Sequence, residues 1–454
     1  MESTGESLRF DILGNLPLEL VLKIVDYLSF NDVLNCQGVS LTWNGALNCD
    51  PIWRRYFDYE LPDKEANFRR DFRGFPIQPC NYKQKVLNQK RILSNWYENK
   101  FERFVVKENF LFAAYDGTTL AAYSDHPKHG LLVYRIERGK PVRTQYLPIK
   151  QRGTCGVLTN TEYIVVVLWS LFIIYRISNA KKPVYKVAYI LERRKGGQVG
   201  KVDNFRDALD GKYHCSVIST LDLLRIDSDI CLINNTIFIY HAADRALCAW
   251  DLEKEELILK KSSPESASHF RHGLIADKEQ VYFAAECISV YSSQAELQYR
   301  IDERLGFNSK LLVNRNLLVV PGVSSISGFD KYSGQRVFEM PHNSSSLLLN
   351  PRLDILYCVI DYTCDHLVLT AYDINAKQSI WEKISDNLLL YDTILVNEKC
   401  IIIPSKPELF TLIDTVTGNI VYSNDAVNNC KFLLARHDIL ICVDGNSTFM
   451  YVYS

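Results

Sequence analysis

Residues 310–329 have the sequence KLLVNRNLLVVPGVSSISGF. Two apolar runs, Leu311–Val313 and Leu317–Val320, are separated by an Asn-Arg-Asn turn. A second turn begins at Pro321 and leads into a third run, which ends at Phe329. Short apolar runs bounded by Gly, Pro, Asn and Ser are typical of β-strands joined by tight turns. This stretch therefore predicts three consecutive strands of one antiparallel sheet.

The same pattern recurs along the chain. Its marker is an aromatic or branched residue at the end of a short strand, followed in most cases by a polar residue and then a turn. The eight marker pairs are Tyr134-Arg135, Tyr175-Arg176, Trp250-Asp251, Tyr291-Ser292, Phe329-Asp330, Tyr372-Asp373, Ile413-Asp414 and Val452-Tyr453. Successive first residues are 41, 75, 41, 38, 43, 41 and 39 positions apart. Six of these intervals lie near the ~40 to 45 residues of a four-stranded propeller blade, so the repeat predicts a β-propeller.

Eight markers predict eight blades, with seven as the alternative. The long interval contains Glu192–Lys212, rich in charge and glycine, which we interpret as a surface insertion. The last marker is followed by no fourth strand in the sequence. We expect residues near Glu102–Lys107 to supply that strand, because a closed ring has no open sheet edge.

In period and strand order this region, residues 104–454, resembles the WD-repeat family. Only Trp250-Asp251 is an intact Trp-Asp pair, and no Gly-His dipeptide occurs. The acid alone is kept at Asp330, Asp373 and Asp414. The resemblance therefore implies a propeller with an eroded signature.

The first sixty residues have a different pattern. Pro17 and Glu19 suit the start of a helix, and the apolar positions that follow recur at three- and four-residue spacing through Leu28. Ser29 and Asp32 have the spacing of a capping box for a second helix. A third helix is expected after Gly38, and a fourth after Asp50-Pro51. Four helices in so short a segment form a small unit that is expected to be only marginally stable by itself.

Together, these residues resemble the F-box motif. The alternative is an amphipathic helical hairpin whose apolar side chains form a core within this chain alone. The resemblance implies binding to the small SKP-family adaptor of cullin-RING ubiquitin ligases. The positions that match the family's adaptor-facing and core residues are Leu16, Pro17, Leu20, Ile24, Leu28, Val39, Trp43 and Trp53. The family commonly has Lys or Arg after the Val-Ser pair, whereas this chain has Leu41.

Between the two regions, residues 81–104 have strong helical character. The segment Lys90-Arg91, followed by Asn95-Trp96, resembles the linker helix of F-box proteins with WD repeats. An ordinary amphipathic helix is the alternative. The predicted organisation is therefore α+β and multidomain: an F-box helical domain at 10–60, a linker with a helix at 61–103, and an all-β WD-repeat-like propeller at 104–454.

Composition narrows the possible functions. There are 52 Lys and Arg against 53 Asp and Glu, so no global field favours nucleic acid or an anionic membrane. The uncharged run Tyr163–Tyr175 is shorter than the ~18 to 20 residues of a membrane span and is interpreted as two buried strands. The 13 cysteines contain no C-x-x-C pair, and the first residues are unlike a signal peptide. We expect reduced thiols and a cytoplasmic or nuclear location.

Propellers bind partners mainly through loops at one end of the ring. In the WD-repeat arrangement, the turn before each marker strand and the connection into each first strand share one end. Basic and aromatic residues occur there, and the candidate substrate-binding residues are Trp169, Arg245, Arg271, Arg304 and Lys406. This mixture suits an acidic or phosphorylated segment, although scattered surface charges that are merely solvated are the alternative.

The sequence contains no phosphate loop of Walker type, no H-E-x-x-H, no G-x-S-x-G and no clustered metal ligands. We therefore expect no catalytic site, no metal and no cofactor. The favoured hypothesis is a non-catalytic substrate receptor of a cullin-RING ligase. The alternatives are a scaffold that binds the adaptor without a cullin and, least favoured, an enzyme with an appended docking module.

Overall fold

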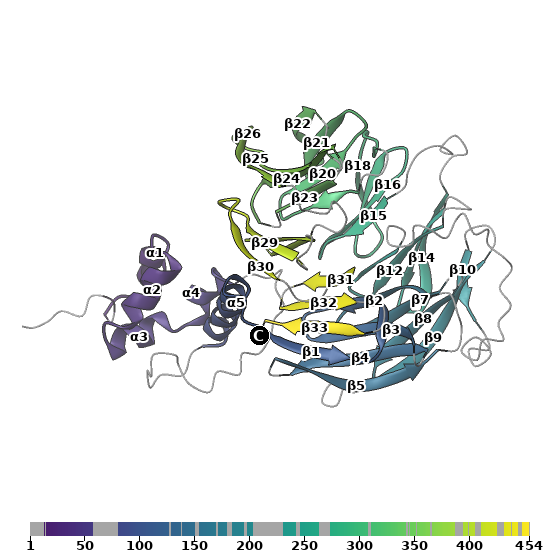
Figure 1. Cartoon of the computed structure of the whole chain (residues 1–454), viewed down its shortest axis with the longest axis horizontal. Coiled ribbons are helices and arrows are strands. Elements are labelled where there is room, and N and C mark those ends of the chain that lie inside the picture. Colours follow the sequence, from purple (N-terminus) through teal and green to yellow (C-terminus); the bar gives the residue numbers. More distant parts are fainter. Residues whose placement is uncertain are drawn as a thin grey trace, which may run out of the picture. The chain divides into compact units, whose positions relative to one another are not determined.

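The computed structural model (Figure 1) describes most of the chain. The described residues are 13, 15–57, 80–126, 129–137, 139–149, 154–168, 171–178, 184–194, 198–202, 230–241, 246–262, 273–306, 310–341, 344, 346–350, 352–363, 366–385, 394–397, 399–404, 410–424, 431–436, 438–443 and 447–453. Two compact units are present. The helical unit comprises Met1–Lys100 with Tyr453–Ser454, and the β unit comprises Phe101–Val452.

The helical unit contains five helices within its described residues: α1 (Leu18–Val25), α2 (Phe30–Gln37), α3 (Leu41–Leu47), α4 (Asp50–Arg54) and α5 (Asn81–Tyr97). The helix α2 begins at its predicted capping residue, and α1, α3 and α4 begin close to the predicted positions. Pro17 is the N-cap of α1, and Pro51 stands in the first turn of α4. Ser29 and Asp32 form the capping box of α2: the Asp32 N–H donates to the Ser29 hydroxyl at 3.2 Å, and the Ser29 N–H donates to the Asp32 carboxylate at 3.0 Å.

The helix α5 ends earlier than predicted. It stops at Tyr97, and Asn99 has a φ of 53°, the left-handed conformation that terminates helices. The predicted helix over residues 98–104 is therefore wrong. Residues 102–104, which the helical stretch and the predicted closing strand share, lie in β1 (Glu102–Val106), where cross-strand pairing outweighs the helical pattern.

The β unit is an eight-bladed propeller, so the seven-blade alternative is wrong. Blade 1 contains β2 (Asn109–Tyr115), β3 (Thr119–His126), β4 (Gly130–Glu137) and β5 (Lys140–Pro148). Blade 2 contains β6 (Thr154–Thr159), β7 (Tyr163–Leu168), β8 (Leu171–Ile177), β9 (Tyr185–Arg194) and β10 (Gln198–Lys201). Blade 3 contains β11 (Ile230–Ile233), β12 (Thr236–His241), β13 (Ala246–Asp251) and β14 (Glu256–Ser262). Blade 4 contains β15 (Gly273–Ala276), β16 (Gln280–Ala284), β17 (Ile288–Ser292) and β18 (Leu297–Ile301).

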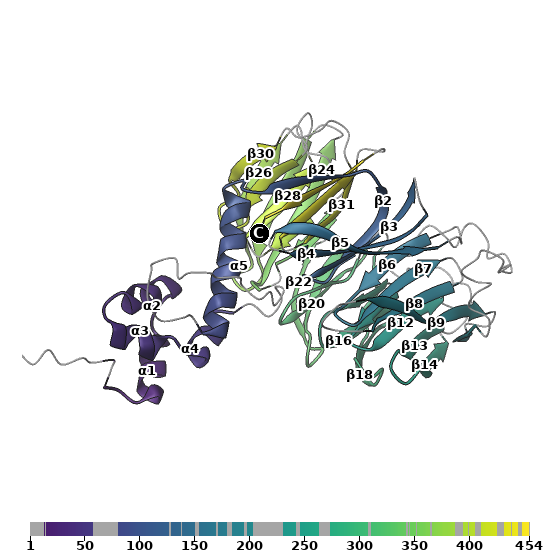
Figure 2. The same cartoon turned by 90° about the horizontal axis from the view of Figure 1, so that it is seen from below.

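The remaining blades follow in chain order around the ring, as Figure 2 shows. Blade 5 contains β19 (Leu312–Val313), β20 (Leu317–Pro321), β21 (Ser325–Asp330) and β22 (Arg336–Pro341). Blade 6 contains β23 (Ser346–Leu349), β24 (Ile355–Thr363), β25 (His366–Asp373) and β26 (Gln378–Ser385). Blade 7 contains β27 (Ile394–Asn397), β28 (Cys400–Pro404), β29 (Phe410–Asp414) and β30 (Ile420–Asn424). Blade 8 contains β31 (Lys431–Arg436), β32 (Ile439–Val443) and β33 (Thr448–Val452), completed by β1.

The ring closes as the sequence predicts. β1 pairs antiparallel with β33, with Glu102 opposite Val452 and Val106 opposite Thr448. The first strands β31 and β2 of blades 8 and 1 also contact each other. The ends of the β unit therefore meet in one sheet, and blade 8 gains the fourth strand that the end of the chain does not supply.

The marker pairs have a structural cause. All eight lie at the end of a third strand, and in seven blades the register shifts by a β-bulge directly before the marker residue. Where the second residue is Asp, its carboxylate accepts hydrogen bonds from the two backbone N–H groups that open the next turn. At Asp330 these donors are Tyr332 and Ser333, at 3.2 and 2.7 Å. The acid is kept because it caps this turn.

The long interval between the second and third markers is only partly an insertion loop. Glu192–Arg194 continues β9, and β10 adds a fifth strand to blade 2. Residues 203–229 lie outside the described part. The uncharged run that begins at Tyr163 forms β7 and β8, as predicted, and no helix among the described residues is long and apolar enough to cross a membrane.

Neighbouring blades are linked by aromatic side chains of fourth strands. Trp381 of β26 donates its indole N–H to the Thr415 carbonyl in blade 7 at 3.0 Å, and Tyr189 of β9 bonds in the same way to Leu252 in blade 3 at 3.1 Å. Gly418 makes room for Trp381: a Cβ there would lie 2.6 Å from the indole ring. Gly418 also has a φ of +69°, which side chains rarely adopt.

We expect Gly418→Ala to destabilise the propeller by about 1–3 kcal/mol, because it adds both a steric clash and backbone strain. Gly156→Ala is the matched control, since a Cβ at Gly156 would meet only Val167 at 3.9 Å. Denaturant melts of the full chain measure both effects. Equal midpoints for the two variants would contradict the role assigned to the glycine.

Candidate docking site and ligand loops

The helical unit has one apolar core. Its buried members are Leu13, Val21, Val25, Val33, Leu34, Leu47, Ile52, Trp53, Phe57 and Val86. Trp53 is fully buried, donates its indole N–H to the Leu47 carbonyl at 2.8 Å, and packs edge-on against Phe30. Trp53, predicted among the docking positions, therefore belongs to the core and can affect a docking surface only by holding the helices above it.

The helix α5 is part of this same unit. The N–H groups of Cys80 and Tyr82 donate to the side chains of Asn48 and Asp50, at 2.8 and 3.0 Å, so the start of α5 is capped by the α3–α4 region. Burial raises the pKa of the Cys80 thiol to about 12, which makes it an unreactive thiol. Lys83, itself buried, lies over the Trp53 ring with its Nζ 5.6 Å from the centroid.

The Asn-Trp pair of α5 also has defined contacts. Trp96 is fully buried and stacks on Tyr453, with 3.5 Å between ring centroids and 13° between planes. The Asn95 side-chain amide donates to the Tyr453 carbonyl at 3.3 Å. The residues that carry the resemblance to a linker helix thus anchor the penultimate residue of the chain to α5.

The helix α1 has two distinct apolar faces. Val21 and Val25 are buried against the core, with Leu28 half-buried beside them. Leu20 and Ile24 point away and are 44% and 38% exposed, and Pro17, one helical turn before Leu20, is also exposed. A one-sided stripe would need only the first face. The second face leaves apolar surface available to another molecule.

A second exposed apolar segment lies at the α2–α3 junction. Val39 is 63% exposed and Leu41 is 61% exposed. Ser40, between them, caps α3 by accepting the Trp43 N–H at 3.1 Å, and the Trp43 side chain is half-buried. Leu16, like Trp43, is half-buried. We call the exposed set Pro17, Leu20, Ile24 and Val39 the docking face.

Sequence comparison identifies this arrangement. A family model described as F-box-like matches residues 13–59. Residues 13–59 are an F-box-like domain. The match begins just before α1 and extends past α4, so it covers every helix that contributes to the docking face.

One curated relative of the chain is Cell division control protein 4 of Saccharomyces cerevisiae. It is 30% identical over 109 residues, which represent 21% of this chain and 13% of that protein. The chain thus matches about an eighth of that relative's length.

One solved structure has a similar fold. Sqt1 of Saccharomyces cerevisiae has a TM-score of 0.50 at 8% identity, with 78% of this chain and 97% of that chain covered. BamB from Moraxella catarrhalis has a TM-score of 0.49 at 12% identity, with 77% and 98% covered. Identities this low concern the architecture of the β unit and no activity.

In blade 5, two of the predicted ligand loops lie together. The connection into blade 5 bonds to the turn before that blade's marker strand, because the Gly306 N–H donates to the Pro321 carbonyl at 2.7 Å. Arg304, in this connection, is exposed. The other candidate substrate residues, Trp169, Arg245, Arg271 and Lys406, lie outside the described residues.

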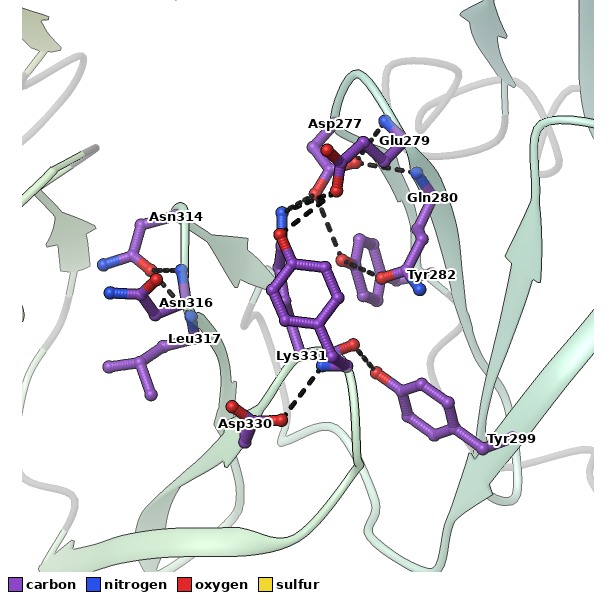
Figure 3. Close-up of polar contacts among 11 residues, drawn as sticks. Asp277, Glu279, Gln280, Tyr282, Tyr299, Asn314, Asn316, Leu317, Asp330 and Lys331 are labelled. Carbon is purple, nitrogen blue, oxygen red and sulfur yellow. Dashed lines mark hydrogen bonds and ion pairs between the residues drawn. The ribbon is translucent and has the colours of Figure 1, made fainter. Parts of the chain in front are cut away.

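The opposite turns contain a polar cluster that sequence reasoning did not single out (Figure 3). Lys331, directly after the marker Asp330, extends from blade 5 to blade 4. Its ammonium lies 3.0 Å from the Asp277 carboxylate and 3.6 Å from that of Glu279. Tyr282 donates its hydroxyl to the same Asp277 oxygen at 3.1 Å, so Lys331 and Tyr282 share this oxygen.

The charged groups of the cluster pair with one another: Lys331 with Asp277 and Glu279. Burial opposes the charge on Lys331, but its hydrogen bond to Asp277 and the nearby Glu279 outweigh burial, and the pKa of Lys331 is raised. Burial, together with the Asp277 charge, raises the pKa of Tyr282 as well, so this hydroxyl stays protonated. The arrangement links two blades. Among the described residues, no group of three or more His, Cys, Asp or Glu could hold a metal ion.

We expect Lys331→Met to lower the free energy of unfolding by about 2–4 kcal/mol, because it leaves the Asp277 carboxylate partly buried without its cation. Asp277→Asn keeps an oxygen for capping the turn, so the double variant should recover part of the loss. A double-mutant cycle in urea measures the coupling. Strictly additive effects would rule out a direct pair.

Proposed function

We propose that this protein is a non-catalytic substrate receptor of a cullin-RING ubiquitin ligase. The F-box-like domain binds an SKP-family adaptor, and the propeller binds the protein to be modified. The observation that carries the proposal is the docking face: an F-box-like domain, closed around its own core, presents a second set of apolar side chains to solvent.

Burial of this face provides the binding energy. Leu20, Ile24 and Val39 are 38–63% exposed, and covering each of them contributes about 1 kcal/mol from the hydrophobic effect. Half-buried Leu16, Leu28 and Trp43 lie under the same helices and set their positions. A few such anchors at the centre of an interface account for most of an affinity.

The propeller supplies the second binding surface. Arg304 stands exposed at the end where the connecting loops meet, and a guanidinium there suits a carboxylate or phosphate of a target segment. Trp169, Arg245, Arg271 and Lys406 remain predicted contributors at the same end. The target is thus a protein with an acidic or phosphorylated segment.

The chemistry of ubiquitin transfer takes place elsewhere in the assembly. A chain that holds the adaptor at one unit and the target at the other turns transfer into an effectively intramolecular event, whose rate follows the effective concentration at the tethered site. A scaffold that binds the adaptor without a cullin is the second candidate, since the docking face serves either role.

We further propose a cytoplasmic or nuclear location. Nine of the described cysteines are free thiols, and six of these lie in propeller blades. Reduced thiols suit a compartment that keeps cysteines reduced.

The double variant Leu20→Asp with Ile24→Asp should reduce co-purification of an SKP-family adaptor and of a cullin at least tenfold, because two charges would be desolvated at the interface. Quantitative affinity purification of the full chain measures this loss. Ile384→Asp is the matched control, since Ile384 is a 62% exposed isoleucine of β26 in the propeller.

The outcomes separate the two candidates. Recovery of adaptor and cullin with the unaltered chain, lost only in the double variant, supports the ligase. Adaptor recovered without any cullin favours the scaffold. Equal recovery of the adaptor with the unaltered chain and with the double variant would contradict both candidate functions.

A further inference from the structure

The most exposed large apolar side chain among the described residues is Tyr27, at 92%. It follows α1, and its N–H donates to the Ile24 carbonyl at 3.1 Å, so the helical path continues through it. Three residues separate Ile24 from Tyr27, which places both side chains on the same side of the helix. Tyr27 therefore extends the stripe of Pro17, Leu20 and Ile24 by one turn.

Leu41 has a comparable place at the other segment. It is 61% exposed and stands two residues after Val39, across the capping Ser40. Leu41 and Val39 together therefore form an exposed apolar pair at the start of α3. Six of the twenty exposed large apolar side chains in the described residues fall within residues 18–41.

The charged groups near Tyr27 are accounted for within the domain. Asp26 forms an ion pair with Arg55 of the turn after α4. Glu19 and Lys23 border the stripe, and Lys23 stands one helical turn before Tyr27. The stripe that contains Tyr27 is therefore an apolar surface with charged groups at its border, which suits a partner surface that is mainly apolar.

A second observation points to the α2–α3 junction. Gln37, at the end of α2, is 1% exposed, and neither polar atom of its side chain has a hydrogen-bond partner among the described residues. The same holds for the amide nitrogen of Asn44 in α3. A buried amide without a hydrogen-bond partner destabilises the fold. A bound molecule that rearranges this junction and supplies such partners would therefore stabilise it.

We propose that Tyr27 and Leu41 are specificity residues of the adaptor interface, which they extend beyond the docking face with apolar contacts. This inference rests on the proposed function, and its occupant is the SKP-family adaptor. Tyrosine suits such a role because it covers a large area at low conformational cost. An interface of this composition has an affinity that depends little on ionic strength.

The test uses the full chain and a purified SKP-family adaptor, with affinity measured by titration calorimetry at low and high salt. Tyr27→Ala and Leu41→Ser should each weaken binding about tenfold, with unchanged melting temperatures. The matched controls Tyr332→Ala and Leu353→Ser alter side chains that are 57% and 46% exposed in propeller turns, and they should bind like the unaltered chain. The affinity of the unaltered chain should change less than threefold between the two salt concentrations.

Three results would overturn the inference. If the unaltered chain binds the adaptor and both variants bind equally well, only the roles of Tyr27 and Leu41 fail. If the unaltered chain binds no adaptor, the proposed function fails as well. If the chain instead forms dimers that both variants abolish, the surface belongs to a second copy of this chain and not to the adaptor.

Discussion

Burial of apolar side chains on both faces of every blade is the constraint on which the β unit depends. In β7 and β13 every residue is buried, because each inner strand packs against two neighbouring blades. A row of such blades would leave one apolar face open at each end. Pairing of β1 with β33 removes both open faces at once and leaves the outer strands to meet solvent. The loops that a target would contact are positioned by this closed ring.

The sequence predicts the blades well because each has a local cause. A bulge places the marker side chain, and the acid after it caps a turn two and three residues away, so both signals lie within a few positions of each other. The capping box of α2 is readable for the same reason. The prediction for α5 failed where a helical pattern runs on into residues that pair with a distant strand. Glu102 and Phe104 lie within the stretch predicted as helical, but Val452 and Met450, more than 300 residues later, pair with them in the closing strand that the sequence also predicts. The fifth strand β10 likewise depends on β9 for its existence.

In the candidate site, too, local features were predictable from the sequence and distant contacts were not. The motif predicts which residues form the F-box-like domain, but spacing alone does not separate its two apolar faces, so fully buried Trp53 and exposed Leu20 appear together among the expected docking positions. Tyr27 follows the same helical spacing that identified Ile24, so the sequence could have predicted it as a docking position. The cluster of Lys331 and Asp277 was not predictable, because its partners come from neighbouring blades 54 residues apart. Polar contacts between blades depend on how the blades pack against each other, which the local sequence does not specify.

Closure between residues 102–106 and 448–452 also determines the order in which the chain can fold. The core of the helical unit joins α1–α4 to Val86 of α5, so its contacts are local and can form before most of the propeller is made. The propeller cannot complete blade 8 until β33 is available to pair with β1. Until then the edge of β1 stays unpaired, and an unpaired strand edge is prone to association.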